Sequence, residues 1–121
     1  MEGSKTLKSL DGLASLVTVG DAGLYLGNND ALTSLAGLRA LARADGNISV
    51  EDNAVLQDVA VLENITFSGL SLTIMNNPTL PTCQARQVYE AQVAKGWTGE
   101  ARICNNLKDG CEGTTDCAYL N

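Results

Sequence analysis

A repeat of 24 residues constrains the fold of this chain more than any other feature. The segments LYLGNNDAL, ISVEDNAVL and LTIMNNPTL begin at Leu24, Ile48 and Leu72 and align without a gap. A related unit precedes them with one extra residue, and residues 101–106 repeat the strand ending once more. Such a period is typical of architectures in which similar units stack on their neighbours.

Each unit contains two hydrophobic patterns with different periods. Alternation of apolar and other residues predicts a short, half-buried strand at the start of each unit. The positions expected to point inward are Leu24, Leu26, Ile48, Val50, Leu72, Ile74, Ala101 and Ile103. Those expected to point outward are Tyr25, Gly27, Ser49, Glu51, Thr73, Met75, Arg102 and Cys104. Leu at every third position from Leu7 to Leu16 and from Leu32 to Leu41 predicts a chain that turns a corner in short steps.

A pair of Asn or Asp residues follows each expected strand. Asn tolerates the left-handed backbone region and its amide satisfies backbone groups in turns, so these pairs predict the turn out of the strand. One amide of each pair can also bond to the next along the stack. The ladder expected from this spacing is Asn29, Asn53, Asn77 and Asn106, with a structural rather than a binding role.

Charge and composition exclude several classes of function. The 121 residues include 14 Asp and Glu against 8 Lys and Arg, a net charge of −6. This disfavours nucleic-acid binding, which needs a cationic surface. The chain has no His, which is the commonest general base and zinc ligand, and its cysteines lack the close pairing of zinc sites. We therefore expect no enzyme, no metal and no cofactor.

The cysteines and the chain ends bear on localisation. Cys83, Cys104, Cys111 and Cys117 all lie in the last third of the chain. An even number of clustered cysteines predicts two disulfides and export to an oxidising compartment, the alternative being four buried thiols. No signal peptide and no transmembrane segment are visible. We expect residues 1–6 to be an N-terminal tail that includes an expression remnant, the alternative being a cytosolic protein.

These motifs resemble the receptor L-domain family, the leucine-rich-repeat-like modules of growth-factor receptor ectodomains and bacterial surface proteins. The resemblance rests on Leu-x-x-Leu-x-x-Leu followed by Leu-x-Leu-x-Asn-Asn-x-x-Leu and covers about residues 7–80. The segment from Asn76 to Cys83, with the later Gly96-Trp97-Thr98-Gly99, is similar to versions from predatory and soil bacteria of the myxobacterial type. It implies an α/β repeat fold, a right-handed β-solenoid with about four short parallel strands. It also implies a secreted or cell-surface protein without shared catalytic residues.

The last third of the chain is expected to cap the solenoid, which spans residues 7–106. A helix at about residues 82–95 begins near Pro81 and stops at Gly96. Its apolar face is expected to hold Ala85, Val88, Tyr89 and Val93, and to lie across the open end with Trp97 as anchor. Residues 107–121 form a Cys-rich C-terminal cap. Three pairings of four cysteines exist, and we favour Cys83–Cys111 and Cys104–Cys117, because the first ties the helix start to the turn after the last strand.

Two functions are compatible with such a stack. The first is a non-enzymatic recognition or adhesion module that binds a protein or glycan through the outer face of the sheet. The candidate face consists of Tyr25, Ser49, Glu51, Thr73, Met75 and Arg102. The alternative is a structural unit that assembles coil on coil, as a homo-oligomer through the N-terminal coil or within a longer solenoid.

Overall fold

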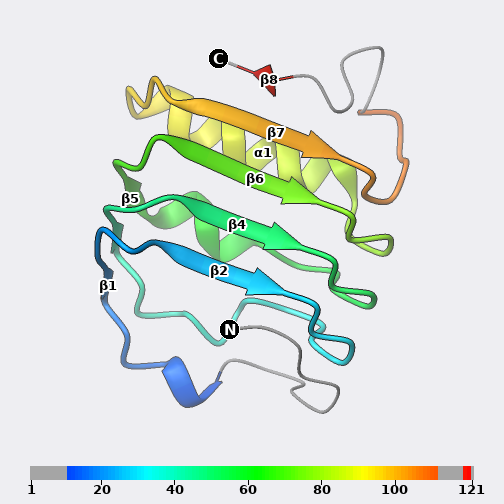
Figure 1. Ribbon diagram of the computed structural model, residues 1–121, viewed down its shortest axis with the longest axis horizontal. Helices are drawn as coiled ribbons and strands as arrows, with labels where there is room; N and C mark the ends of the chain where they lie inside the picture. Colours follow the sequence, from blue (N-terminus) through cyan, green and yellow to red (C-terminus); the bar gives the residue numbers. More distant parts are fainter. Residues whose placement is uncertain (1–10, 112–118, 121) are drawn as a thin grey trace.

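The computed structural model describes residues 11–111 and 119–120 and contains one principal sheet, sheet A (Figure 1). Its strand order is β2 (Leu24–Gly27), β4 (Ile48–Glu51), β6 (Ser71–Met75), β7 (Glu100–Cys104) and β8 (Tyr119–Leu120). The first four strands are parallel, which confirms the predicted strands, and β8 runs antiparallel to β7. Leu24 lies opposite Ile48 and Ile48 opposite Leu72, so the register of the sheet equals the sequence repeat.

A second parallel sheet, sheet B, forms another wall of the repeat. It contains β1 (Thr18–Val19), β3 (Arg43–Ala44) and β5 (Thr66–Phe67), in that order. Two 3-10 helices, η1 (Asp11–Leu13) and η2 (Ala60–Asn64), lie in the segments where every third residue is apolar. The short helical turns at the corners were therefore predictable from the sequence. The strands of sheet B were not, because two residues are too few to show an alternating pattern.

The apolar residues of both patterns meet in one core. The third-position residues of the second and third units are at most 4% exposed: Leu32, Leu35, Leu38, Leu41, Leu56, Val59, Leu62 and Ile65. The inward strand residues from Leu26 to Ile103 are at most 2% exposed. Leu13 and Leu16 of the first unit, and Leu24 at the start of the second, are only partly buried. Burial of this order removes each aliphatic side chain from water and stabilises the stack by about 1.5–3 kcal/mol per residue.

The helix α1 (Thr82–Ala94) has the predicted bounds but a different buried face. Its buried residues are Thr82, Ala85, Val88 and Gln92, whereas Val93 is 44% exposed. The expectation for Val93 was wrong because position 92 continues the row of Ala85 and Val88 along the helix. Gln92 is buried with its amide satisfied, since Nε2 donates to the carbonyls of Leu62 and Ile65 at 2.9 and 3.2 Å.

The position expected for α1, across the end of the stack, was also wrong. The helix packs against η2 and β7, and Figure 1 shows it behind β6 and β7. Lys95, just after α1, donates to the carbonyls of Glu63 and Ile65 at 2.7 and 2.9 Å. Together with Gln92, it satisfies the carbonyl groups at the end of η2, which a 3-10 helix leaves without partners. Because α1 contacts η2 beside it, α1 continues the helical layer that η2 begins. Within the described ranges, no helix has the length and apolar character needed to cross a membrane.

Trp97 anchors the segment that leaves α1. It is 9% exposed, with its ring centroid 5.0 Å from that of Phe67 and 6.3 Å from that of Tyr89. Its indole Nε1 donates to the carbonyl of Gly69 at 2.9 Å. Several expected features cannot be placed: the tail at residues 1–6, Leu7 and Leu10, and most of the cap at 107–121 lie outside the described residues.

A column of glycines allows neighbouring units to approach closely at the corner before sheet A. Gly23, Gly46 and Gly69 recur every 23 residues. A Cβ on Gly46 would overlap the backbone nitrogen of Gly23 and lie 2.6 Å from the carbonyl of Asp21. A Cβ on Gly69 would likewise overlap the backbone of Gly46. The neighbouring atoms are backbone, so a side chain would force the units apart.

Replacement of Gly46 by Ala is therefore expected to lower the free energy of unfolding by about 1–3 kcal/mol. The matched control is Gly20→Ala, since a Cβ on Gly20 meets nothing within 4 Å. This control should be neutral, or stabilising by up to about 1 kcal/mol through the entropy of the unfolded chain. Urea unfolding of both variants measures the difference. Equal stabilities of the two variants would show that the column is not a packing requirement.

A small pH-dependent contribution to stability comes from the exposed corner beside sheet B. Arg43 Nε donates to Asp45 Oδ1 at 2.7 Å, and Ser68 Oγ donates to the same oxygen at 3.1 Å. The hydrogen bond from Arg43 is the main cause that lowers the pKa of Asp45 in the folded state. A carboxyl group with a lowered pKa stabilises the fold above its unfolded-state pKa, and this stabilisation disappears as the pH falls through its folded-state pKa.

Asp45→Asn should therefore be slightly less stable than the parent at neutral pH, and the difference should disappear in acid. The effect is small because the Arg43 and Asp45 side chains are 63% and 24% exposed. Unfolding free energies measured from neutral pH down to about pH 3 test this. A difference that stays constant with pH would contradict the assignment.

Candidate functional site

The outward side chains of sheet A form two rows across the strands. Residues Tyr25, Ser49, Thr73 and Arg102 are successive register partners in the first row. In the second row the partners are Gly27, Glu51, Met75 and Cys104. The structure thus brings all six residues predicted for the candidate face onto neighbouring strands of one surface. Parallel pairing places register partners about 4.8 Å apart, so each row is nearly continuous.

Exposure differs along the two rows. Tyr25 is 38% exposed, whereas Ser49, Glu51, Thr73, Met75 and Arg102 are all partly buried. Gly27 is buried because the Tyr25 ring lies over it, and a Cβ there would overlap the phenol group. The tyrosine ring is thereby laid against the sheet and presents a face to solvent. We define the exposed-sheet surface as Tyr25, Ser49, Glu51, Thr73, Met75 and Arg102.

The exposed-sheet surface is mixed in chemistry. Glu51 accepts a hydrogen bond from the Ser49 hydroxyl on the same strand, β4. Arg102 brings a positive charge on β7, two strands away from Glu51. Hydroxyl groups, one thioether, one carboxylate and one guanidinium therefore alternate over a short distance. Such a surface provides hydrogen-bond donors, acceptors and apolar contact to a partner.

The second Asn of each turn forms the ladder expected from the sequence. Asn29, Asn53 and Asn77 are 0% exposed and Asn106 is 6% exposed. Asn53 Oδ1 accepts hydrogen bonds from the backbone N–H and Nδ2 of Asn29 at 3.1 and 3.3 Å. Asn77 Oδ1 receives the same pair from Asn53, both at 3.1 Å. Asn106 Oδ1 receives it from Asn77 at 3.2 and 3.1 Å.

The amide nitrogens of the ladder also bond to strand carbonyls. Asn53 Nδ2 donates to the carbonyl of Leu26 at 3.1 Å, and Asn77 Nδ2 donates to that of Val50 at 3.0 Å. The first residue of each turn has a separate role, because it takes the left-handed conformation. The φ values are 57° for Asn28, 59° for Asp52, 61° for Asn76 and 55° for Asn105. Asn and Asp are the non-glycine residues that adopt this region most readily, which explains the paired turn motif.

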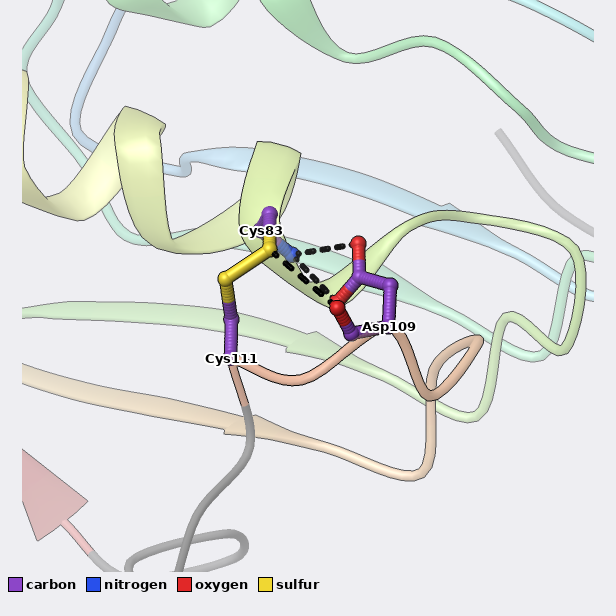
Figure 2. Close-up of side chains that lie close together, drawn as sticks. All are labelled: Cys83, Asp109 and Cys111. Carbon is purple, nitrogen blue, oxygen red and sulfur yellow. Dashed lines mark hydrogen bonds between the residues drawn. A yellow bond between two sulfur atoms is a disulfide. The ribbon is translucent and has the colours of Figure 1, made fainter.

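A disulfide ties the start of α1 to the turn after β7, as Figure 2 shows. Cys83 and Cys111 are bonded, with a Cα–Cα distance of 5.1 Å. Both carboxylate oxygens of Asp109 accept from the backbone N–H of Cys83 at 3.1 Å. The carboxylate thus occupies the N-terminus of a helix whose own first turn has no acidic residue. We call Cys83, Asp109 and Cys111 the disulfide clasp. No pattern in the sequence predicts the contact of Asp109 with Cys83, although Asp109 lies two residues before Cys111.

The disulfide clasp is a structural element rather than a metal centre in this state. Its sulfur and carboxylate atoms lie within 4.8 Å of one another, which resembles a ligand set. Metal ions bind cysteine as the thiolate, however, and both sulfurs are committed to the disulfide. Cys104, outward on β7, is 2% exposed and also disulfide-bonded. Cys117, its expected partner, lies outside the described residues.

A scan against protein-family models, a search of curated proteins and a search of solved structures all found no match to this chain.

Proposed function

We propose that this chain is a non-enzymatic recognition or adhesion module of the leucine-rich-repeat-like, receptor L-domain kind. In this proposal it is a right-handed solenoid, secreted or held at a cell surface, and its partner is a protein or a glycan. The partner contacts the exposed-sheet surface. The observation that carries the proposal is the register of sheet A, which places six outward side chains in two rows on one surface.

The construction of sheet A supports a binding role. Inward residues such as Val50 and Ile74 are 0% exposed and hold the strands in place. The outward residues between them lie outside the buried core, so their identity is free to suit a partner. Tyr25 supplies a flat aromatic surface, and tyrosine is enriched among residues that dominate binding energy. Arg102, another residue type of this kind, lies in the same row.

The chemistry of the exposed-sheet surface supports binding rather than catalysis. Glu51 is the one carboxylate among its six residues, and it accepts a hydrogen bond from Ser49. Acid–base catalysis by carboxylates usually needs two such groups, held in different environments. A disulfide at Cys83–Cys111 supports the proposed location outside the reducing cytoplasm.

Binding should be sensitive to a bulky charge on sheet A and insensitive to one on sheet B. The matched variants are Thr73→Arg at the centre of the exposed-sheet surface and Thr66→Arg at the exposed residue of β5. Both are assayed on a glycan array and on an array of purified extracellular proteins. Thr73→Arg and Tyr25→Ala should weaken each interaction of the parent chain by about tenfold or more, while Thr66→Arg should not. Unchanged binding by Thr73→Arg and Tyr25→Ala would remove the exposed-sheet surface as the site.

A specific observation favours assembly as a second function. In the first unit, Leu13 and Leu16 are only partly buried, whereas their counterparts Leu38 and Leu41 are at most 4% exposed. Val17, next to them, is 52% exposed. Stacking of a further unit on this side would bury these side chains. Sedimentation over a wide concentration range tests this, since a species that stays monomeric at high concentration argues against stacking.

A further inference from the structure

We propose a second binding site, distinct from the exposed-sheet surface, for a small organic carboxylate with an apolar body. The site is a groove of about 370 Å³, a size typical of small-ligand sites. It lies between the loop at residues 68–70, which leads into β6, and residues 95–99, which connect α1 to β7. We call it the Trp97 groove.

The apolar part of the Trp97 groove lies on a firmly held backbone. Phe67 and Trp97 are among the residues that line it, and Leu70 is 80% exposed. Leu70 does not belong to a loose loop, because its N–H donates to Asn47 Oδ1 at 2.9 Å. Its carbonyl accepts from the N–H of Glu100 at 3.0 Å. Burial of an aliphatic side chain of this size is favourable by about 1.5–3 kcal/mol. The exposed Leu70 side chain therefore favours a ligand with an apolar body that covers it.

Two glycines keep the wall of the groove bare. A Cβ on Gly99 would lie 2.5 Å from the Trp97 ring and 2.6 Å from the Leu70 carbonyl. Gly96 has a φ of +96°, a conformation that side chains rarely adopt. Gly99 therefore packs directly against the Trp97 ring, whereas a Cβ on Gly96 would meet nothing within 4 Å, so the open space at Gly96 is left to a ligand.

The charge of the groove selects an anion. Among the described residues that line it, Lys95 is the one charged residue, so there is no Asp or Glu, although the whole chain has a net charge of −6. The ammonium group donates to the carbonyls of Glu63 and Ile65, which hold it in position but do not neutralise its charge. An ammonium has three donors, so these two bonds leave one for a ligand. One lysine matches one carboxylate, whereas phosphate recognition generally uses several charged or backbone donors.

The single tryptophan of the chain makes this proposal directly measurable. Trp97 lines the groove, so its fluorescence reports on ligand without a label. The full chain is titrated with 3-phenylpropionate and with the neutral 3-phenylpropionamide. The carboxylate should give a saturable change in emission, with the amide binding about tenfold or more weakly because the charge-assisted hydrogen bond is lost.

Variants locate the effect. Lys95→Gln keeps a donor toward the Glu63 and Ile65 carbonyls but removes the charge, and it should weaken 3-phenylpropionate about tenfold. The matched control Lys108→Gln, at an exposed lysine after β7, should leave binding unchanged. Leu70→Ser should weaken acid and amide alike. A parent chain that shows no saturable change, or binds acid and amide equally, overturns the proposal without recourse to any variant. Binding that Thr73→Arg abolishes would instead place the ligand on the exposed-sheet surface and also overturn it.

Discussion

Asn53→Ala is expected to lower the free energy of unfolding by about 3–5 kcal/mol, the largest effect of any single substitution considered. Asn53 is fully buried and links the units on both sides of it. Its removal takes away the Asn53 Oδ1 that accepts hydrogen bonds from the backbone N–H and side-chain amide of Asn29. It also leaves the Leu26 carbonyl without its donor. Buried polar groups that lose their partners each cost about 1–3 kcal/mol, because no water replaces the partner.

Urea unfolding under non-reducing conditions measures this loss. The control is Asn64→Ala, the same substitution at an exposed residue at the end of η2. It should change stability by no more than about 0.5 kcal/mol. Asn77→Ala should behave like Asn53→Ala, since Asn77 makes the corresponding bonds to Asn53, Val50 and Asn106. If Asn53→Ala is no more destabilising than Asn64→Ala, the ladder does not hold the units together.

Removal of the disulfide in the double variant Cys83→Ser/Cys111→Ser is expected to cost about 2–4 kcal/mol. The bond closes a loop with a sequence separation of 28, which includes α1 from its second residue onward and all of β7. Without it the unfolded chain gains conformational freedom, and in the folded state Asp109 is no longer held at the start of α1. Because the unfolded state becomes more extended, the dependence of unfolding free energy on denaturant should also steepen.

A second variant separates the two parts of the disulfide clasp. Asp109→Asn keeps the disulfide and removes the charge at the helix N-terminus, which is expected to cost about 0.3–1 kcal/mol. Denaturant titrations of both variants give these values. A double cysteine variant that unfolds at the same denaturant concentration as Asp109→Asn would show that the covalent bond adds nothing to stability.

The sequence repeat predicted the part of the fold in which each unit obeys the same rule. Residues one repeat apart in sequence are register partners in sheet A. The repeat therefore predicted the four parallel strands, their inward residues and the buried leucines at every third position. The helix bounds also followed from Pro81 and Gly96. The buried helix face did not, because the choice between Gln92 and Val93 depends on where the carbonyls of η2 lie.

Features that depend on contacts between distant segments were not predictable from pattern alone. The strand β8 lies in a segment without periodicity, and its pairing with β7 is a tertiary contact. The glycines at 23, 46 and 69 did carry a signal, because they recur before each strand. The reason for these glycines, however, is the short distance between the backbones of neighbouring units, which only the structure gives. The Trp97 groove likewise combines residues 67–70 with 95–99, which no local motif connects.

The candidate site divides in the same way. Strand alternation was sufficient to assign Tyr25, Ser49, Thr73 and Arg102 to one row, because side-chain direction alternates along a strand. Strand alternation did not predict the burial of Gly27 beneath Tyr25, since this depends on the rotamer of the tyrosine side chain. The bond between Ser49 and Glu51 also arises from side-chain conformation within β4.

Site-specific photo-crosslinking tests the central proposal, that the exposed-sheet surface is the binding site, most directly. A photoreactive phenylalanine analogue is placed at position 73, in the centre of that surface, or at position 66 on sheet B. Each labelled chain is then irradiated with a partner identified on the arrays. The proposal predicts covalent capture of the partner from position 73 and not from position 66. Capture from position 66 alone, or equally from both positions, would contradict it.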